Sequence, residues 1–173
     1  FDSMERCFAH SNTFGQNDLA MAAGLATLHV LQEEKLASNA EKMGRALVSG
    51  LHDLADRYEM LHEIRGKGLM LGVQFGEPRS LTLKTGWKLL HSMNSDIFCQ
   101  MITMPLMEKY SILTQVAGHG LDTIRIMPPL VIDQADVDYF LESFEAVLKD
   151  AHRFPGSAWT TTKNLALRTA RSA

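Results

Sequence analysis

Residues 64–75 carry the clearest structural signal in the chain, and they read Ile64-Arg65-Gly66-Lys67-Gly68-Leu69-Met70-Leu71-Gly72-Val73-Gln74-Phe75. Apolar residues occupy every second position from Leu69 to Phe75, and this period of two predicts a β-strand with one buried face. The glycines at positions 66 and 68 permit a tight turn. The segment therefore predicts two short strands joined by a glycine-rich turn, and Gly76-Glu77-Pro78 ends the second of them.

The period changes to three and four residues on the N-terminal side of this strand pair. The apolar positions with that spacing are Leu36, Ala40, Met43, Leu47, Leu51 and Leu54. They predict an amphipathic helix that lies on a core. Before it, residues 19–31 are apolar nearly all round and follow Asn17 and Asp18, two good helix N-caps. We expect this first helix to be buried against another subunit or a large sheet.

On the C-terminal side, residues 84–109 predict mostly helix with a stop near Pro105. Residues 111–115 and 123–127 predict a second strand pair, and Asp133 caps a last amphipathic helix that reaches Leu148. From about residue 153 we expect a tail with a short helix over 165–171. The fold class that follows is α+β: a small antiparallel sheet covered by helices.

Composition excludes several classes of function. The 173 residues carry a formal net charge of -3 with no basic stripe, which argues against a nucleic-acid partner. No apolar run approaches the roughly 20 residues that span a bilayer, so no membrane contact is expected. The seven histidines lack metal-ligand spacing, so we predict no metal site. Cys7 and Cys99 form no paired motif and are typical of reduced thiols in a cytoplasmic protein.

Three segments, in order, resemble class III aminotransferases. The first is His10-Ser11-Asn12-Thr13-Phe14-Gly15-Gln16-Asn17-Asp18-Leu19-Ala20-Met21-Ala22-Ala23, similar to the family's H-x-x-T-[FY]-G-G-[NH]-P-[LV]-x-x-A-A. The second, residues 64–72, is similar to V-R-G-x-G-L-M-x-G. The third, Thr123-Ile124-Arg125-Ile126-Met127-Pro128-Pro129-Leu130-Val131-Ile132, is similar to L-R-[LI]-x-P-P-L-x-I. Together they make the chain similar to the C-terminal part of an ornithine-, acetylornithine- or omega-amino-acid-type enzyme of fold type I.

The resemblance implies a domain plan, a cofactor and partners. Residues 1–33 would be the end of the large domain that binds pyridoxal 5'-phosphate (PLP), with a connecting helix. Residues 34–152 would be the C-terminal small domain, and residues 153–173 a tail. The large-domain part of the same enzyme would be a partner. A homodimer would share its active site across the interface and act on a small-molecule amino donor and a carbonyl acceptor.

The resemblance also assigns site residues. Thr13, near a glycine and just before a helix start, would bind the cofactor phosphate, and Asn12 would add a second contact. The alternative is that Thr13 merely caps a turn. Arg125 would bind the substrate carboxylate, because its planar guanidinium matches a carboxylate with two hydrogen bonds. The alternative is a structural salt bridge to a local Asp or Glu.

The sequence also departs from the family pattern. Asp18 stands where proline is usual, and Gln16 replaces a common glycine or its neighbour. We expect the Schiff-base lysine of the family to lie upstream of Phe1, so no catalytic residue is assigned in this chain; Lys67, Lys84 and Lys88 have no cofactor-binding surroundings. Two alternatives remain open at this point: other PLP chemistry on the same fold (decarboxylase, racemase or aminomutase), and a non-catalytic dimerisation or binding module.

Overall fold

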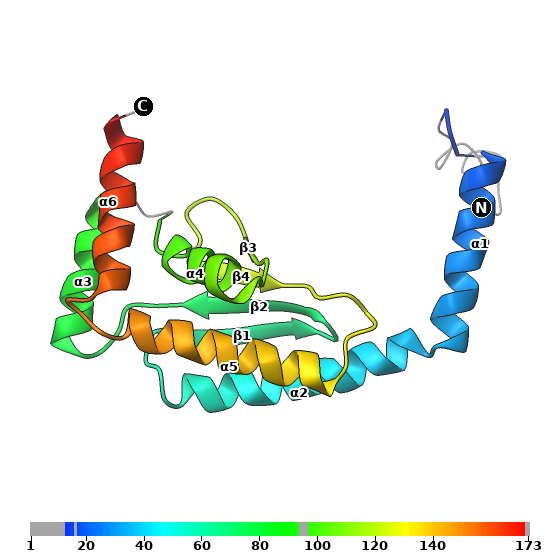
Figure 1. Ribbon diagram of the computed structural model, residues 1–173, viewed down its shortest axis with the longest axis horizontal. Coiled ribbons are helices and arrows are strands. Elements are labelled where there is room, and N and C mark those ends of the chain that lie inside the picture. Colours follow the sequence, from blue (N-terminus) through cyan, green and yellow to red (C-terminus); the bar gives the residue numbers. More distant parts are fainter. Residues whose placement is uncertain (1–12, 16, 94–96, 172–173) are drawn as a thin grey trace, which may run out of the picture. The chain divides into compact units, whose positions relative to one another are not determined.

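The computed structural model describes residues 13–15, 17–93 and 97–171. The chain divides into two compact units, Phe1–Ser38 and Asn39–Ala173, and each is described by itself. Figure 1 shows the helices and strands along the chain. No helix in the described part of the chain is both long and apolar enough to cross a lipid bilayer.

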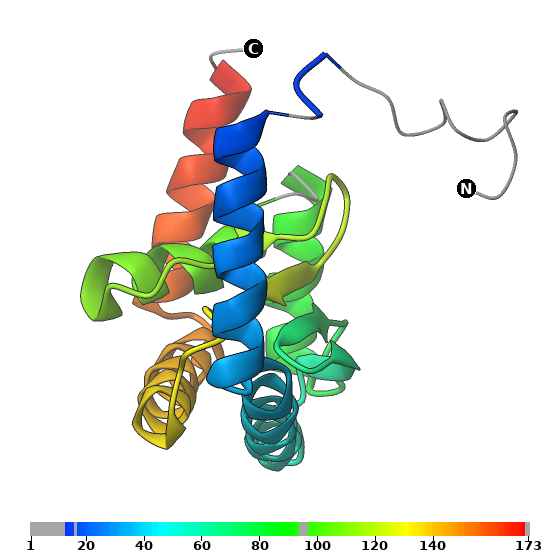
Figure 2. The ribbon, with the colours of Figure 1, turned by 90° about the vertical axis from the view of Figure 1, so that its right-hand side faces the viewer.

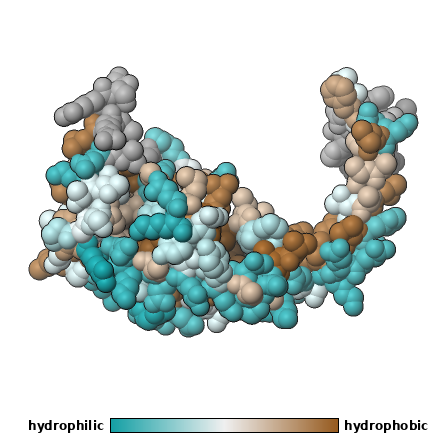
Figure 3. All heavy atoms as spheres, viewed as in Figure 1, coloured by the Kyte–Doolittle hydropathy of each residue, from teal (hydrophilic) through white to brown (hydrophobic). Residues whose placement is uncertain are grey.

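Helix α1 (Asp18–Glu33) begins where the sequence predicts. The Asn17 side chain accepts a hydrogen bond from the backbone N–H of Ala20 at 3.1 Å, which satisfies one of the free donors of the first turn. None of the residues of α1 is buried within this chain. Its exposed apolar side chains include Leu19, Met21, Leu25, Leu28 and Val30. Figure 3 shows apolar atoms along much of this helix, and the burial that the sequence predicts for it stays a prediction.

Four antiparallel strands form the sheet in the order β1-β2-β4-β3. They are β1 (Leu61–Lys67), β2 (Met70–Phe75), β3 (Gln115–Val116) and β4 (Thr123–Ile126). On β2 the side chains of Leu71, Val73 and Phe75 are buried, as the period of two predicts. The predicted strand at 111–115 is shorter and later than expected, because only Gln115 and Val116 pair with β4.

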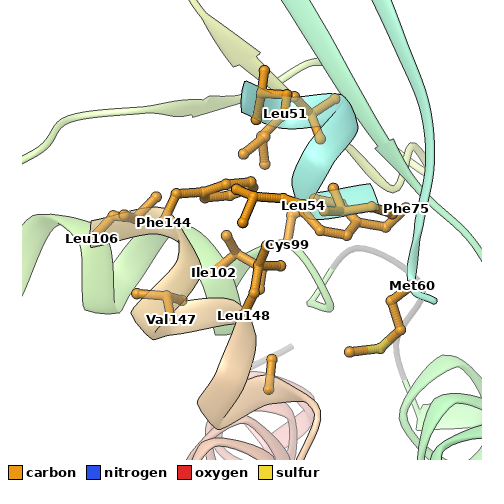
Figure 4. Packing of buried hydrophobic residues seen from close by; sticks show 14 of the residues in the cluster. Leu51, Leu54, Met60, Phe75, Cys99, Ile102, Leu106, Phe144, Val147 and Leu148 are labelled. Atoms are coloured by element: carbon orange, nitrogen blue, oxygen red, sulfur yellow. The ribbon is translucent and has the colours of Figure 1, made fainter. Parts of the chain in front are cut away.

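Helices α2 (Leu36–Ala55) and α5 (Gln134–Ala151) lie side by side along one face of this sheet (Figures 1 and 2). Helix α5 begins with a capping box: Asp133 and Asp136 each accept a hydrogen bond from the other's backbone N–H at 3.1 Å. Figure 4 shows side chains from α2, β2 and α5 meeting in one core. The labelled members from these elements are Leu51, Leu54, Phe75, Phe144, Val147 and Leu148.

The region predicted as one helix with a stop at Pro105 forms two helices. These are α3 (Leu81–Met93) and α4 (Gln100–Tyr110), and Pro105 lies inside α4. The predicted stop was wrong. Proline removes one backbone donor here, but Ile102 and Leu106 on either side are fully buried, so packing holds the helix together. The helix ends instead at Tyr110, and its C-cap, Ser111, has a left-handed backbone (φ 56°).

Helix α6 (Ser157–Arg171) begins eight residues earlier than the short helix predicted over 165–171. Trp159 and Thr162 on its first turns are buried. The Trp159 indole N–H donates to the backbone oxygen of Ala151 in α5 at 2.7 Å. Tertiary contact, rather than the weak helix propensity of the threonine run, explains why the helix starts early.

Candidate functional site

The face of the sheet opposite the buried Leu71 and Val73 is polar. Residues directly opposite each other on antiparallel strands place their side chains on the same face. The register pairs Arg65 with Gly72, Gly72 with Arg125, and Arg125 with Gln115. One row across all four strands therefore carries two arginines, a glycine between them and a glutamine at the β3 edge.

Arg125 is the site residue of this row that the sequence predicts. Its neighbours on β4, Ile124 and Ile126, are buried on the other face, and the arginine itself is exposed. Its guanidinium Nη2 donates a hydrogen bond to Oε1 of Gln115 at 3.1 Å. Within the described residues the guanidinium contacts no Asp or Glu, so the structural salt bridge considered as the alternative is not found there.

Four other arginines of the described chain each pair with a carboxylate, whereas the Arg79 side chain, like that of Arg125, forms no ion pair among the described residues. The four are Arg45, Arg57, Arg65 and Arg153. Arg65 is the informative comparison, since it lies on the same face of the sheet as Arg125. It donates to Glu63 of the same strand at 3.1 Å and to Gln74 of β2 at 2.6 Å, so the second hydrogen bond joins strands β1 and β2. The Arg125 guanidinium has no carboxylate partner among the described residues.

Thr13 lies in the first unit, in a turn over residues 13–15 just before α1. Its side chain is exposed, and the backbone N–H of Asn17 donates to the Phe14 oxygen at 3.3 Å to close the turn. The side-chain cap of α1 comes from Asn17 and not from Thr13. An exposed hydroxyl ahead of a helix N-terminus fits the phosphate of PLP, because such a position offers hydrogen-bond donors and a favourable dipole. Asn12 lies outside the described residues.

A second group of titratable side chains lies next to the β3–β4 loop. His91 of α3 contacts Asp122 Oδ2 through Nε2 at 2.8 Å and the Trp87 backbone oxygen through Nδ1 at 2.9 Å. Both partners are acceptors, so both contacts are hydrogen bonds only when the ring is an imidazolium. The nearby Cys99 thiol is buried, which raises its pKa to about 12 and makes it a poor nucleophile. No group of three potential metal ligands occurs in the part of the chain that the structure describes.

A family model described as aminotransferase class-III matches residues 2–148. An alanine–glyoxylate aminotransferase 2 homologue of Arabidopsis thaliana is 33% identical over 79% of this chain and 26% of its own length. A diaminobutyrate–2-oxoglutarate aminotransferase of Rhizobium meliloti is 35% identical over 75% of this chain and 27% of its own length. A PLP-bound amine transaminase from an uncultivated Pseudomonas species matches with a TM-score of 0.66 at 23% identity, over 86% of this chain and 31% of that one.

The chain therefore belongs to the class III aminotransferases, a PLP-dependent family, and its fold is that of the C-terminal part of a fold type I enzyme. It spans about a quarter of the length of the curated relatives it matches. Those relatives are named as aminotransferases, which does not favour the decarboxylase, racemase, aminomutase or binding-module alternatives.

Gln115 is the residue of this site that sequence reasoning did not single out. Strand pairing alone places it beside Arg125, and the signal was weak, because β3 has only two residues and follows a run with no clear alternation. Arg65, Gly66 and Gly68, interpreted as structural, lie in the β1–β2 hairpin.

Proposed function

We propose that this chain is the C-terminal portion of a PLP-dependent aminotransferase that transfers an amino group between an amine or amino acid and a keto acid or aldehyde. The observation that carries the proposal is the Arg125 guanidinium, which is exposed on the polar face of the sheet and hydrogen-bonded only to a neutral amide among the described residues. A fixed cation of this kind binds a carboxylate with two parallel hydrogen bonds. Arg125 then orients the substrate by its carboxylate.

Thr13 and Asn12 are proposed to bind the phosphate of the cofactor. The exposed Thr13 hydroxyl and the free backbone donors at the start of α1 supply neutral hydrogen bonds to an anion. PLP, when bound, supplies the electron-accepting ring that amino transfer requires. The lysine that holds it covalently is proposed to lie in the large-domain part of the enzyme, so the residues of this chain bind and orient but do not bond to the cofactor.

The substrates belong to a class defined by a carboxylate. The relatives reported above are named for alanine, glyoxylate, diaminobutyrate and 2-oxoglutarate, all of which carry one. A site built on Arg125 fits the carboxylate that such donors and acceptors share. Which donor and which acceptor this enzyme uses is decided by a substrate screen.

The assembly is proposed to be a homodimer whose active site is shared across the interface, with the large-domain part of the enzyme as a further contact. The exposed apolar side chains of α1 support this, because a helix with that composition is stable in water only when it is covered. The proposed domain plan is the end of the large domain to residue 33, a small domain over 34–152 and a C-terminal tail over 153–173, and helix α6 of this tail packs against α5. The compartment is proposed to be the cytoplasm, and subcellular fractionation tests it.

The first experiment replaces Arg125 by alanine in the full-length enzyme and measures kcat and KM with glyoxylate and with 2-oxoglutarate. Removing one partner of a buried, hydrogen-bonded charge pair costs about 3 kcal/mol of binding free energy, so KM for the accepted keto acid should rise about a hundredfold. Arg45→Ala is the control, because Arg45 pairs with Glu41 on an exposed face of α2 and should leave KM unchanged. An unchanged KM in the Arg125 variant would contradict the carboxylate role.

A further inference from the structure

The surroundings of Arg125 lack an acidic side chain on either neighbouring strand. On the β2 side its register partner is Gly72, which has no side chain. A Cβ added there would meet Thr123 Cγ2 at 3.6 Å and Arg65 Cγ at 3.8 Å, so the position is roomy. On the β3 side its partner is Gln115, a neutral amide. Neither of these two cross-strand partners therefore compensates the positive charge of Arg125.

Gln115 is held in place by the backbone of its hairpin. The next residue, Val116, pairs with Ile124, and the Ala117 N–H donates to the Thr123 oxygen at 2.7 Å. The Gln115 Oε1 accepts from Arg125 Nη2 at 3.1 Å. Because a hydrogen bond to a charged group is stronger than one between neutral groups, this contact favours one orientation of the guanidinium out of the many open to an exposed arginine.

We propose that Gln115 is a positioning residue for Arg125 that fixes the guanidinium without neutralising it, and that it thereby sets the affinity of the site for the substrate carboxylate. This inference rests on the proposed function of Arg125. The neutral charge of Gln115 is the essential property. A glutamate of the same shape would form an internal ion pair with Arg125, as Glu63 does with Arg65 on the same face, and would compete with the substrate.

The sheet itself offers a matched control. Gln74 on β2 also accepts a hydrogen bond from an arginine, Arg65, through its Oε1 at 2.6 Å. Gln74→Glu therefore makes the same chemical change, on the same face, beside an arginine that already has a carboxylate partner. Gln115→Glu, Gln115→Ala and Gln74→Glu in the full-length enzyme form the test series.

The measurements are kcat and KM with glyoxylate and with 2-oxoglutarate, together with calorimetric titration of each keto acid. We expect Gln115→Glu to raise KM and the dissociation constant about tenfold, and Gln115→Ala about threefold, with kcat nearly unchanged. Gln74→Glu should change either constant by less than about twofold. A purely structural role for Gln115 would instead give equal losses for the Glu and Ala variants, and mainly in kcat.

The outcomes separate this inference from the function on which it rests. If Arg125→Ala weakens keto-acid binding while Gln115→Glu does not, or if Gln115→Glu and Gln115→Ala have equal effects, the positioning role of Gln115 is wrong and the role of Arg125 stands. If Arg125→Ala binds the keto acids as wild type does, the carboxylate role fails and the inference fails with it.

Discussion

The pKa values of two histidines, His91 and His152, are shifted in opposite directions by their neighbours. Burial disfavours the charged form of His91, but its hydrogen bonds to Asp122 and to the Trp87 carbonyl, with the charge of Asp122, outweigh burial and raise its pKa. His152 is the reverse case. Burial lowers its pKa, while its ring accepts from the Met60 N–H at 3.3 Å and contacts the Leu148 oxygen at 2.8 Å, which fits one neutral tautomer.

The His91–Asp122 pair predicts that the folded state loses stability as the pH rises above about 6.5. A group whose pKa is raised on folding stabilises the folded state fully below its unfolded pKa, near 6.5, and this contribution is lost as pH rises through the folded pKa. Asp122→Asn removes the pair. We expect the free energy of unfolding of the variant to fall less than that of wild type between pH 6 and pH 8, measured by urea denaturation of the full-length enzyme.

The control for this pH dependence is His152→Gln, which should instead change how the free energy of unfolding varies at acidic pH. Because the pKa of His152 is lowered on folding, the unfolded chain takes up a proton first and stability falls as pH drops below about 6.5. The His152 variant should therefore lose less stability than wild type from pH 7 to pH 5. If Asp122→Asn and wild type have parallel stability curves from pH 6 to pH 8, His91 is not charged by this pair.

At the scale of elements, the β1–β2 hairpin and helix α2 touch through glycines. Gly68 in the turn has φ 55°, in the left-handed region that side chains disfavour. Gly44 of α2 packs against it so closely that a Cβ at position 44 would lie 2.3 Å from the Gly68 carbonyl oxygen. This contact is between two backbone segments, so neither of them can move away by changing a rotamer.

Gly44→Ala should therefore destabilise the compact unit Asn39–Ala173 by about 1–3 kcal/mol, because the helix must shift away from the turn. Gly72→Ala is the control, since its added methyl would make only ordinary contacts with Thr123 and Arg65 and should change stability by less than about 1 kcal/mol. Urea denaturation of the two full-length variants checks both. Equal stability of the Gly44 variant and wild type would show that α2 does not pack on this turn as described.

The sequence predicted helices and strands correctly where one local signal determines them. Alternation fixed β2, the spacing of Leu47 and Leu51 fixed α2, and Asp133 marked the start of α5. It failed where packing overrides local preference: Pro105 lies within α4, and α6 begins at Ser157.

For the candidate site, the family pattern supplied Thr13 and Arg125. The cross-strand partner of Arg125 could not be predicted, because the pairing register depends on where the loop between β3 and β4 begins and ends, and no local pattern in the sequence marks those positions.

At the scale of the whole chain, helix α6 lies beyond the residues that the family model matches, which end at 148, and yet it belongs to the core. Trp159 anchors it. The indole packs edge-on against Phe154 at 5.2 Å between ring centroids, lies 6.5 Å from Phe98, and donates its N–H to Ala151. A buried aromatic side chain with a satisfied donor contributes several kcal/mol, so α6 is an integral part of the compact unit Asn39–Ala173.

Trp159→Ala should cost about 3–5 kcal/mol of stability, because it leaves a cavity beside Phe98 and removes the hydrogen bond to Ala151. Thr161→Ala, at an exposed position of the same helix, should change stability by less than about 0.5 kcal/mol. The measurement is urea denaturation of the full-length enzyme, combined with hydrogen exchange of the α6 backbone amides. Faster exchange confined to α6, without global destabilisation, would place the helix in a separate folding unit. If Trp159→Ala matched the Thr161 variant in both measurements, α6 would not be packed on the core in solution.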